Sequence, residues 1–267
     1  MGAKKVLQQI APPFVWTVAH RVRQGLQGRQ AAYDTYDEAL AAAGGPGYDV
    51  EAVAEGTVAQ FAREAETVRG RFPFADVRTI RQLAAMWRVR DALGGKPLRV
   101  LDVGGQVGVH FQRLRVHLPE NAIAAWDVVE TGSLARLAKA KCTEPGLRFF
   151  EGLESLPAGD YDVAFSSGTL QAVPDPWAFF ESVGSRAKWL LLDRIPFGAF
   201  ERDRLMVLRN ALETYRVAIP IWFFAETTWL ERFAASGWKP VLRWRAPEET
   251  ITFDGVPVEY SGLLLQR

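Results

Sequence analysis

Apolar runs of strand length alternate with segments of helical periodicity through the middle of the chain. Each run is rich in Val, Leu, Phe or Trp, and the intervening segments place apolar side chains three or four positions apart. Such alternation at short spacing predicts a parallel, doubly wound α/β sheet with right-handed crossovers. The predicted strands cover residues 100–103, 123–130, 147–151, 161–167 and 189–193. The predicted helices between them cover residues 107–118, 133–141 and 177–186.

Helical patterns precede this core. Residues 31–43 are alanine-rich and end at a glycine cluster, Asp49 reads as the N-cap of a second helix, and Pro73 marks a break. We therefore predict a helical extension over residues 1–75, acting as a lid or a dimerisation surface. Residues 76–267 form the second predicted domain.

A further helix is predicted over residues 76–93, directly before the first strand. Its apolar stripe has helical spacing, which is typical of core packing, and consists of Val77, Ile80, Leu83, Ala84 and Trp87. After Asp193 the pattern changes. It predicts helices over 201–215 and 227–235, an aromatic stretch over 219–224, and strands over 241–245 and 260–265.

Composition narrows the class of protein. A hydrophobic fraction of 48% and a charged fraction of 24% are ordinary for a soluble globular protein, and a net charge of +1 argues against nucleic acid as a partner. Cys142 has no cysteine to pair with, which indicates a reducing, cytoplasmic compartment and a structural thiol. No signal peptide or membrane span is evident, and no pair of His or Cys has metal-ligand spacing.

The basic, partly apolar arm over residues 1–26 leaves two roles open. It has the composition of a segment that contacts a membrane surface, but Pro12 and Pro13 interrupt any continuous helix. Packing against its own domain or against a partner chain, as in a homodimer, is the favoured interpretation.

The strand over 100–103 ends in a glycine-rich turn followed by helical spacing. Gly104, Gly105 and Gly108 follow Asp102, so backbone N–H groups point into one concavity that a ligand can approach closely. A carboxylate at Asp102 would repel a pyrophosphate, whereas Glu130, at the end of the next strand, suits the two hydroxyls of a ribose. These residues predict a site for a nucleoside without a pyrophosphate.

The stretch from Val100 to Gly108 resembles the first motif of class I S-adenosylmethionine-dependent methyltransferases, and Glu130 matches their acidic second motif. The resemblance implies S-adenosylmethionine as the cofactor. It also implies a Rossmann-like, seven-stranded, mostly parallel sheet whose last strand is antiparallel. One residue departs from the family pattern: Gln106 stands where the middle glycine is usual. Either the loop runs differently there, or the Gln106 side chain hydrogen-bonds the methionine moiety.

Two later segments also resemble this family. Residues 151–157 resemble the segment that borders the adenine, which implies an apolar contact from Leu153 and a contact to the amino group from Glu151 or Glu154. Residues 166–176 resemble the fourth-motif loop beside the reactive methyl, which brings Ser167 to the cofactor and Gln171 to an acceptor hydroxyl.

Most of the chain also resembles a group of uncharacterised bacterial methyltransferase-like proteins associated with surface-polysaccharide genes. The resemblance rests on residues 36–49, on residues 166–176 and on the region from Trp238 to Trp244. It implies no particular acceptor.

Several residues allow both a functional and a structural interpretation. His110 is either a general base or a polar residue at a helix start. Arg194 binds an acidic or phosphorylated acceptor or forms a surface ion pair. An aromatic group lines an acceptor pocket or belongs to the core, and it consists of Tyr215, Trp222, Phe223, Phe224 and Trp229.

The sequence therefore predicts an S-adenosylmethionine-dependent methyltransferase that O-methylates a small molecule or a glycan precursor. One alternative is a non-catalytic cofactor-binding or scaffold protein of the same fold. The other is a nicotinamide-dependent oxidoreductase, because a glycine loop after a strand occurs in both classes.

Overall fold

The computed structural model describes residues 31–45, 47, 49–51, 53–59, 76–209 and 218–267. The predictions for the basic arm, for the break at Pro73 and for Tyr215 lie outside these residues. Within the described ranges, no helix combines the length and the apolar character that crossing a bilayer requires.

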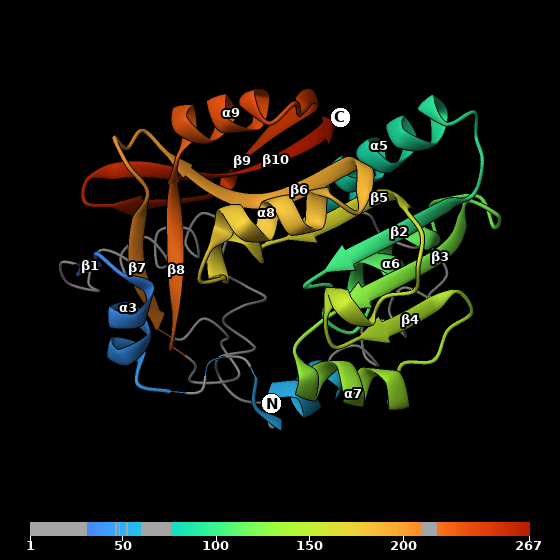
Figure 1. Cartoon of the computed structure of the whole chain (residues 1–267), viewed down its shortest axis with the longest axis horizontal. Helices are drawn as coiled ribbons and strands as arrows, with labels where there is room; N and C mark the ends of the chain where they lie inside the picture. The colour runs from blue at the N-terminus through green and yellow to red at the C-terminus, as the bar shows by residue number, and fades with distance from the viewer. Residues whose placement is uncertain (1–30, 46, 48, 52, 60–75, 210–217) are drawn as a thin grey trace, which may run out of the picture.

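Five parallel strands form the centre of the sheet, in the spatial order β4-β3-β2-β5-β6 (Figure 1). Their near-continuous apolar sequences are those of strands covered on both faces. They confirm the predicted parallel α/β core. The strands are β2 (Leu98–Val103), β3 (Ile123–Val129), β4 (Leu147–Phe150), β5 (Tyr161–Ser167) and β6 (Ala187–Gly198).

Helices cover both faces of these strands. On one face, α5 (Val77–Ala92), α6 (Val109–Arg115) and α7 (Gly132–Lys141) pack into a core that includes Trp126 and Phe165. On the other face, α8 (Pro176–Gly184) and α9 (Glu226–Ala235) pack through Phe180 and Phe233. Short 3-10 turns η1 (Leu153–Ser155) and η2 (Leu170–Ala172) follow β4 and β5.

The last strand, β10 (Val256–Gln266), runs antiparallel to both β6 and β9 (Lys239–Phe253). Asp254 and Gly255 join β9 to β10, and both have positive φ (48° and 79°), as a tight hairpin turn requires. Leu264 packs on one face of the sheet and Leu263 and Leu265 on the other, because successive side chains of a strand alternate.

Three strands extend the sheet beyond the predicted seven, so the prediction of a seven-stranded sheet is wrong. The described residues form ten strands. Antiparallel strands β1 (Ala32–Tyr33), β7 (Arg204–Arg209) and β8 (Ala218–Ala225) join the core where β8 pairs with the end of β6, through Phe197–Phe224 and Gly198–Ala225. The predicted helix over 201–215 is therefore wrong across β7.

The N-terminal part of the described chain packs on this added array. Helix α3 (Tyr36–Ala43) begins with a capping box between Thr35 and Glu38 and ends at Gly44, which has a φ of 69°. It lies against β7 and β8, and β1 precedes it where the sequence predicted helix. Residues 51 and 53–59 are helical, and the Asp49 carboxylate before them accepts hydrogen bonds from Ser133.

Helix α5, whose N-cap is Asp76, confirms the predicted helix, yet it turns a different face to the core. The predicted core stripe leaves Val77, Ile80 and Trp87 exposed by 56%, 54% and 42%, whereas the neighbouring stripe that contains Gln82 and Met86 is buried. The orientation brings Gln82 to a buried carboxylate of the sheet, as described below. The buried face of α5 therefore includes a polar contact, the hydrogen bond from Gln82 to that carboxylate.

Candidate functional site

The glycine loop begins where β2 ends and leads directly into α6. Gly104, Gln106 and Gly108 have φ values of 77°, 53° and 81°, so three left-handed residues within five turn the chain. The N–H of Gly104 donates to the carbonyl of Val129 at 2.8 Å, which ties the loop to β3. A side chain at Gly104 would collide with Thr169, which covers the loop from the segment after β5. Only glycine allows this close packing.

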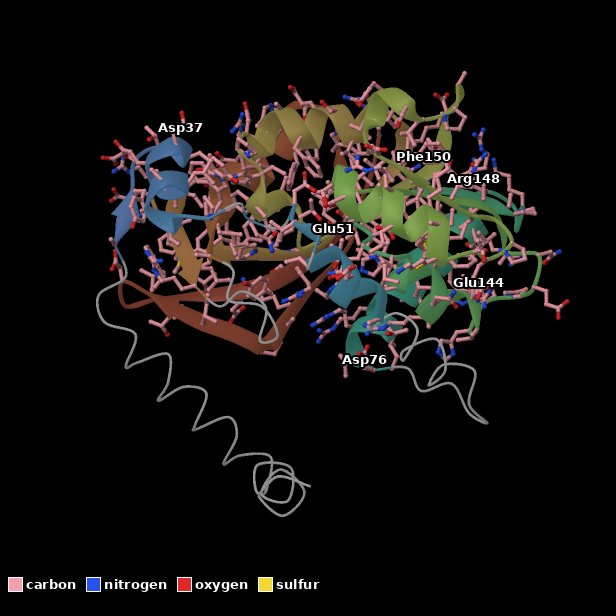
Figure 2. The ribbon with its side chains drawn as sticks, turned by 90° about the horizontal axis from the view of Figure 1, so that it is seen from below. Asp37, Glu51, Asp76, Glu144, Arg148 and Phe150 are labelled. Carbon is pink, nitrogen blue, oxygen red and sulfur yellow. The ribbon has the colours of Figure 1, made fainter. Side chains whose placement is uncertain are left out.

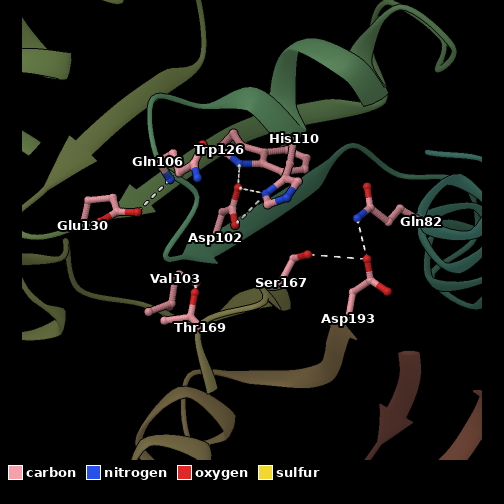
Figure 3. Close-up of polar contacts among 10 residues, drawn as sticks. All are labelled: Gln82, Asp102, Val103, Gln106, His110, Trp126, Glu130, Ser167, Thr169 and Asp193. Atoms are coloured by element: carbon pink, nitrogen blue, oxygen red, sulfur yellow. Dashed lines mark hydrogen bonds and ion pairs between the residues drawn. The ribbon is translucent and has the colours of Figure 1, made fainter. Parts of the chain in front are cut away.

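Glu130 faces this loop from the end of β3 (Figure 3). Its Oε1 accepts the backbone N–H of Gln106 at 2.9 Å, and its Oε2 accepts the N–H of Thr131 at 2.9 Å. Burial raises the pKa of this carboxyl, and the nearby charge of Asp102 acts in the same direction. The two motifs, 24 residues apart in sequence, therefore meet at the carboxyl ends of neighbouring strands.

Asp102 lies beneath the loop rather than above it. Its side chain is fully buried, and Oδ2 accepts the indole N–H of Trp126 at 3.0 Å. Nδ1 of His110 lies 3.0 Å from Oδ2 and 3.3 Å from Oδ1. The ring of His110 also packs at a centroid distance of 4.5 Å from Phe165. A side chain at Gly105 would collide with the Asp102 carboxylate, so the loop backbone packs directly on it.

A second buried carboxylate, Asp193, lies on β6 beside the end of β5. Gln82 Nε2 donates to it at 2.7 Å, Trp244 Nε1 at 3.2 Å and Ser167 Oγ at 3.5 Å. These donors come from α5, β9 and β5, so the carboxylate joins three elements at the carboxyl end of the sheet. Figure 3 shows Ser167 between this carboxylate and the glycine loop.

The segment after β5 is held from two sides. Tyr36 on α3 donates its hydroxyl to the carbonyl of Ala172 at 3.0 Å, and Trp222 on β8 donates its indole N–H to the carbonyl of Val173 at 3.1 Å. Between β5 and these anchors lies Gln171, which is buried and whose Oε1 has no partner among the described residues. A buried carbonyl oxygen without a donor is costly, so this atom is suited to accept a hydrogen bond from a ligand.

The remaining predicted site residues make contacts outside the hydrogen bonds described so far. Glu151 pairs with Arg136 of α7 at 2.8 Å, and both side chains are largely exposed. Leu153 is half-buried in η1 against the core. Arg194 has a φ of 57°, and its guanidinium lies 5.4 Å from the centroid of the Tyr260 ring.

The predicted aromatic group belongs largely to the core. Phe223, Phe224 and Trp229 are buried, and Trp222 is half-buried beside the segment after β5. Of the two interpretations of this group, core packing therefore holds for Phe223, Phe224 and Trp229.

A groove lies at the β4 edge of the sheet. It is lined by the end of α7, the turn after it and β4, including Lys139, Glu144 and Phe150. Figure 2 shows Glu144, Arg148 and Phe150 along this edge. None of the residues lining the groove belongs to the glycine loop.

Sequence reasoning missed four residues of the site. Asp193 ends a buried apolar run as Asp102 and Glu130 do, so the same signal would have found it. Gln82, Trp126 and Thr169 carry no such signal, because their partners lie far away in sequence.

No protein-family model matches the chain, and no curated protein matches it in sequence. Among solved structures, it is similar to the N-terminal domain of EvdMO1 with S-adenosylhomocysteine bound. The identity is 11% and the TM-score 0.50, over 78% of this chain and 97% of that chain.

The chain is also similar to human N-acetylserotonin methyltransferase in complex with S-adenosylmethionine. The identity is 14% and the TM-score 0.52, over 94% of this chain and 66% of that chain. At these identities the likeness shows the fold alone, which is the α/β fold of that S-adenosylmethionine-dependent methyltransferase.

Proposed function

We propose that the protein binds S-adenosylmethionine and transfers its methyl group to a hydroxyl of a small molecule or a glycan precursor. The observation that carries the proposal is the hydrogen bond between the Glu130 carboxylate and the backbone N–H of Gln106. It brings an acidic side chain to the mouth of a glycine loop, where a ribose with two hydroxyl donors finds acceptors.

The chemistry of the donor set fits this cofactor. Each oxygen of Glu130 accepts one backbone N–H and keeps lone-pair capacity for a hydroxyl. We propose that Glu130 holds the ribose, that the loop over Gly104–Gly108 supports the methionine moiety, and that Leu153 borders the adenine. Ser167 lies at the same end of the sheet, and we propose that it contacts the cofactor there.

The fold likeness supports the proposal, because the two similar structures hold S-adenosylmethionine or S-adenosylhomocysteine. The bound cofactor supplies an activated methyl group, so the protein has to position and desolvate the acceptor. Gln171, with its unpartnered Oε1, is suited to orient an acceptor hydroxyl.

Calorimetric titration with S-adenosylmethionine and S-adenosylhomocysteine tests the proposal. We expect micromolar binding to the wild-type protein and a loss of at least about tenfold in Glu130→Ala, because the ribose contacts disappear. Glu120→Ala is the matched control, since Glu120 is exposed and precedes the opposite end of β3.

The outcomes separate the remaining alternatives. Binding without turnover on any hydroxyl acceptor would favour a non-catalytic protein of this fold. Absence of binding by folded wild-type protein, together with binding of a nicotinamide dinucleotide, would favour an oxidoreductase.

A further inference from the structure

His110, Asp102 and Trp126 form a chain of polar contacts beneath the glycine loop. The indole N–H of Trp126 and Nδ1 of His110 both lie 3.0 Å from Oδ2 of Asp102. The carboxylate is fully buried, whereas the His110 side chain is 15% exposed. The imidazole therefore lies between a buried acceptor and the surface of the site.

This arrangement selects one tautomer of the imidazole. The indole of Trp126 has only a donor, so its hydrogen bond marks the carboxylate oxygen as an acceptor. Nδ1 then donates its proton to Asp102, and Nε2 of the neutral ring carries the lone pair. Among the described residues, Nε2 has no hydrogen-bond partner.

The position of Asp102 is unsuited to direct contact with a bound cofactor. Both its oxygens face His110, one of them also faces Trp126, and the loop backbone at Gly105 packs on the carboxylate. A ligand above the loop is separated from this carboxylate by the loop itself.

We infer that Asp102 is a positioning residue that holds His110 with Nε2 available to take the proton of an acceptor hydroxyl. This inference rests on the proposed methyl transfer to a hydroxyl, which needs a base, whereas a neutral amine already has a free lone pair. The O–H bond breaks and its proton goes to Nε2. The freed electron pair would form the new bond from oxygen to the methyl carbon, while the bond from that carbon to sulfur breaks and its electron pair leaves with the neutral thioether. The carboxylate of Asp102 balances the positive charge of the resulting imidazolium, which then returns its proton to solvent.

Nitrogen-15 NMR of the imidazole tests this role without a known acceptor. The chain has three histidines, so the spectrum of His110→Gln identifies the His110 signals. We expect the Nδ1-protonated tautomer in the wild-type protein and a shift towards the Nε2-protonated tautomer in Asp102→Asn. An Nε2-protonated His110 in the wild-type protein would overturn the inference.

Calorimetry distinguishes a positioning residue from a cofactor ligand. S-adenosylhomocysteine affinity should stay within about threefold of wild type in both Asp102→Asn and His110→Gln. A loss of more than about tenfold in Asp102→Asn, with the His110 tautomer unchanged, would make Asp102 a cofactor ligand and refute the inference.

Two further outcomes keep the proposals apart. If His110→Gln weakens S-adenosylhomocysteine but not 5′-methylthioadenosine, which lacks the amino-acid moiety, then His110 binds that moiety and is no base. If the folded wild-type protein binds neither compound, the proposed function fails, whereas the tautomer measurement still tests the Asp102–His110 contact.

Discussion

Replacing Arg148 by Met would remove the main partner of a buried carboxylate. Asp127 on β3 is fully buried and accepts two parallel hydrogen bonds from Arg148 on β4, each of 2.7 Å. The hydroxyl of Tyr161 on β5 donates a third, also of 2.7 Å, across the intervening strand β2. Burial, followed by the bond to Asp127, raises the pKa of this phenol. In Arg148→Met, the Asp127 carboxylate keeps only the hydrogen bond from the Tyr161 hydroxyl.

The size of the effect follows from this geometry. Removing one partner of a buried ion pair costs about 3–5 kcal/mol when nothing replaces it. The Arg148 side chain is 48% exposed, so water reaches part of the vacated position, and we expect about 2–3 kcal/mol. Tyr161→Phe removes one hydrogen bond to a charged group and should cost about 1.5–3 kcal/mol.

Urea unfolding followed by fluorescence measures both values, and Arg148→Met should lower the midpoint by about 1 M at an unchanged slope. Arg136→Met is the matched control, because its pair with Glu151 is largely exposed and should contribute less than about 1 kcal/mol. Equal midpoints for the two arginine variants would refute the reasoning, since Asp127 would then be solvated without Arg148.

Three further predictions concern single residues of the site and core. Gln106→Gly should raise stability by up to about 1 kcal/mol in urea unfolding, because it relieves a φ of 53°. It should leave S-adenosylhomocysteine affinity within about threefold by calorimetry, because the backbone N–H makes the bond to Glu130. Burial raises the pKa of Glu130 above its ordinary 4.5, so the folded state holds its proton longer than the unfolded chain. The free energy of unfolding should therefore fall as the pH rises above 4.5 through the folded-state pKa of Glu130. Urea unfolding of Glu130→Gln should show a weaker dependence on pH, because this carboxyl is gone. The same pH dependence in Glu130→Gln and in the wild-type protein would contradict the prediction. Burial raises the pKa of Cys142 to about 11, so a thiol reagent should modify it only after unfolding, and rapid reaction of the native protein would show that the thiol is accessible.

The apolar runs were sufficient to predict the central strands, because a strand buried on both faces tolerates little polar sequence. They could not predict β7. Its residues, from Arg204 to Arg209, mix arginines with Leu and Met in a sequence that also suits a helix, and pairing with β8 makes it a strand. Proline has no backbone N–H to donate within a sheet, and Pro220 is tolerated in β8 because β6 pairs with β8 only further along, at Phe224 and Ala225.

The same limit applies to the site. The acid-and-glycine pattern predicted that Asp102, Gln106 and Glu130 act together, and the structure brings them together around one loop. The pattern could not show that the Asp102 carboxylate lies under that loop. Its orientation depends on Trp126 and His110, whose side chains reach it only in the folded sheet.

The pairing of β1 with β7 has a consequence for synthesis on the ribosome. Ala32 lies opposite Met206, so β1 can pair with β7 only once translation has passed Met206. The central strands β2–β5 form from consecutive segments and can assemble earlier, whereas contacts distant in sequence close late. Tyr36 reaches the segment after β5 from α3, beside β1. We therefore expect the nascent chain to form its glycine loop before Tyr36 can donate its hydrogen bond to the Ala172 carbonyl.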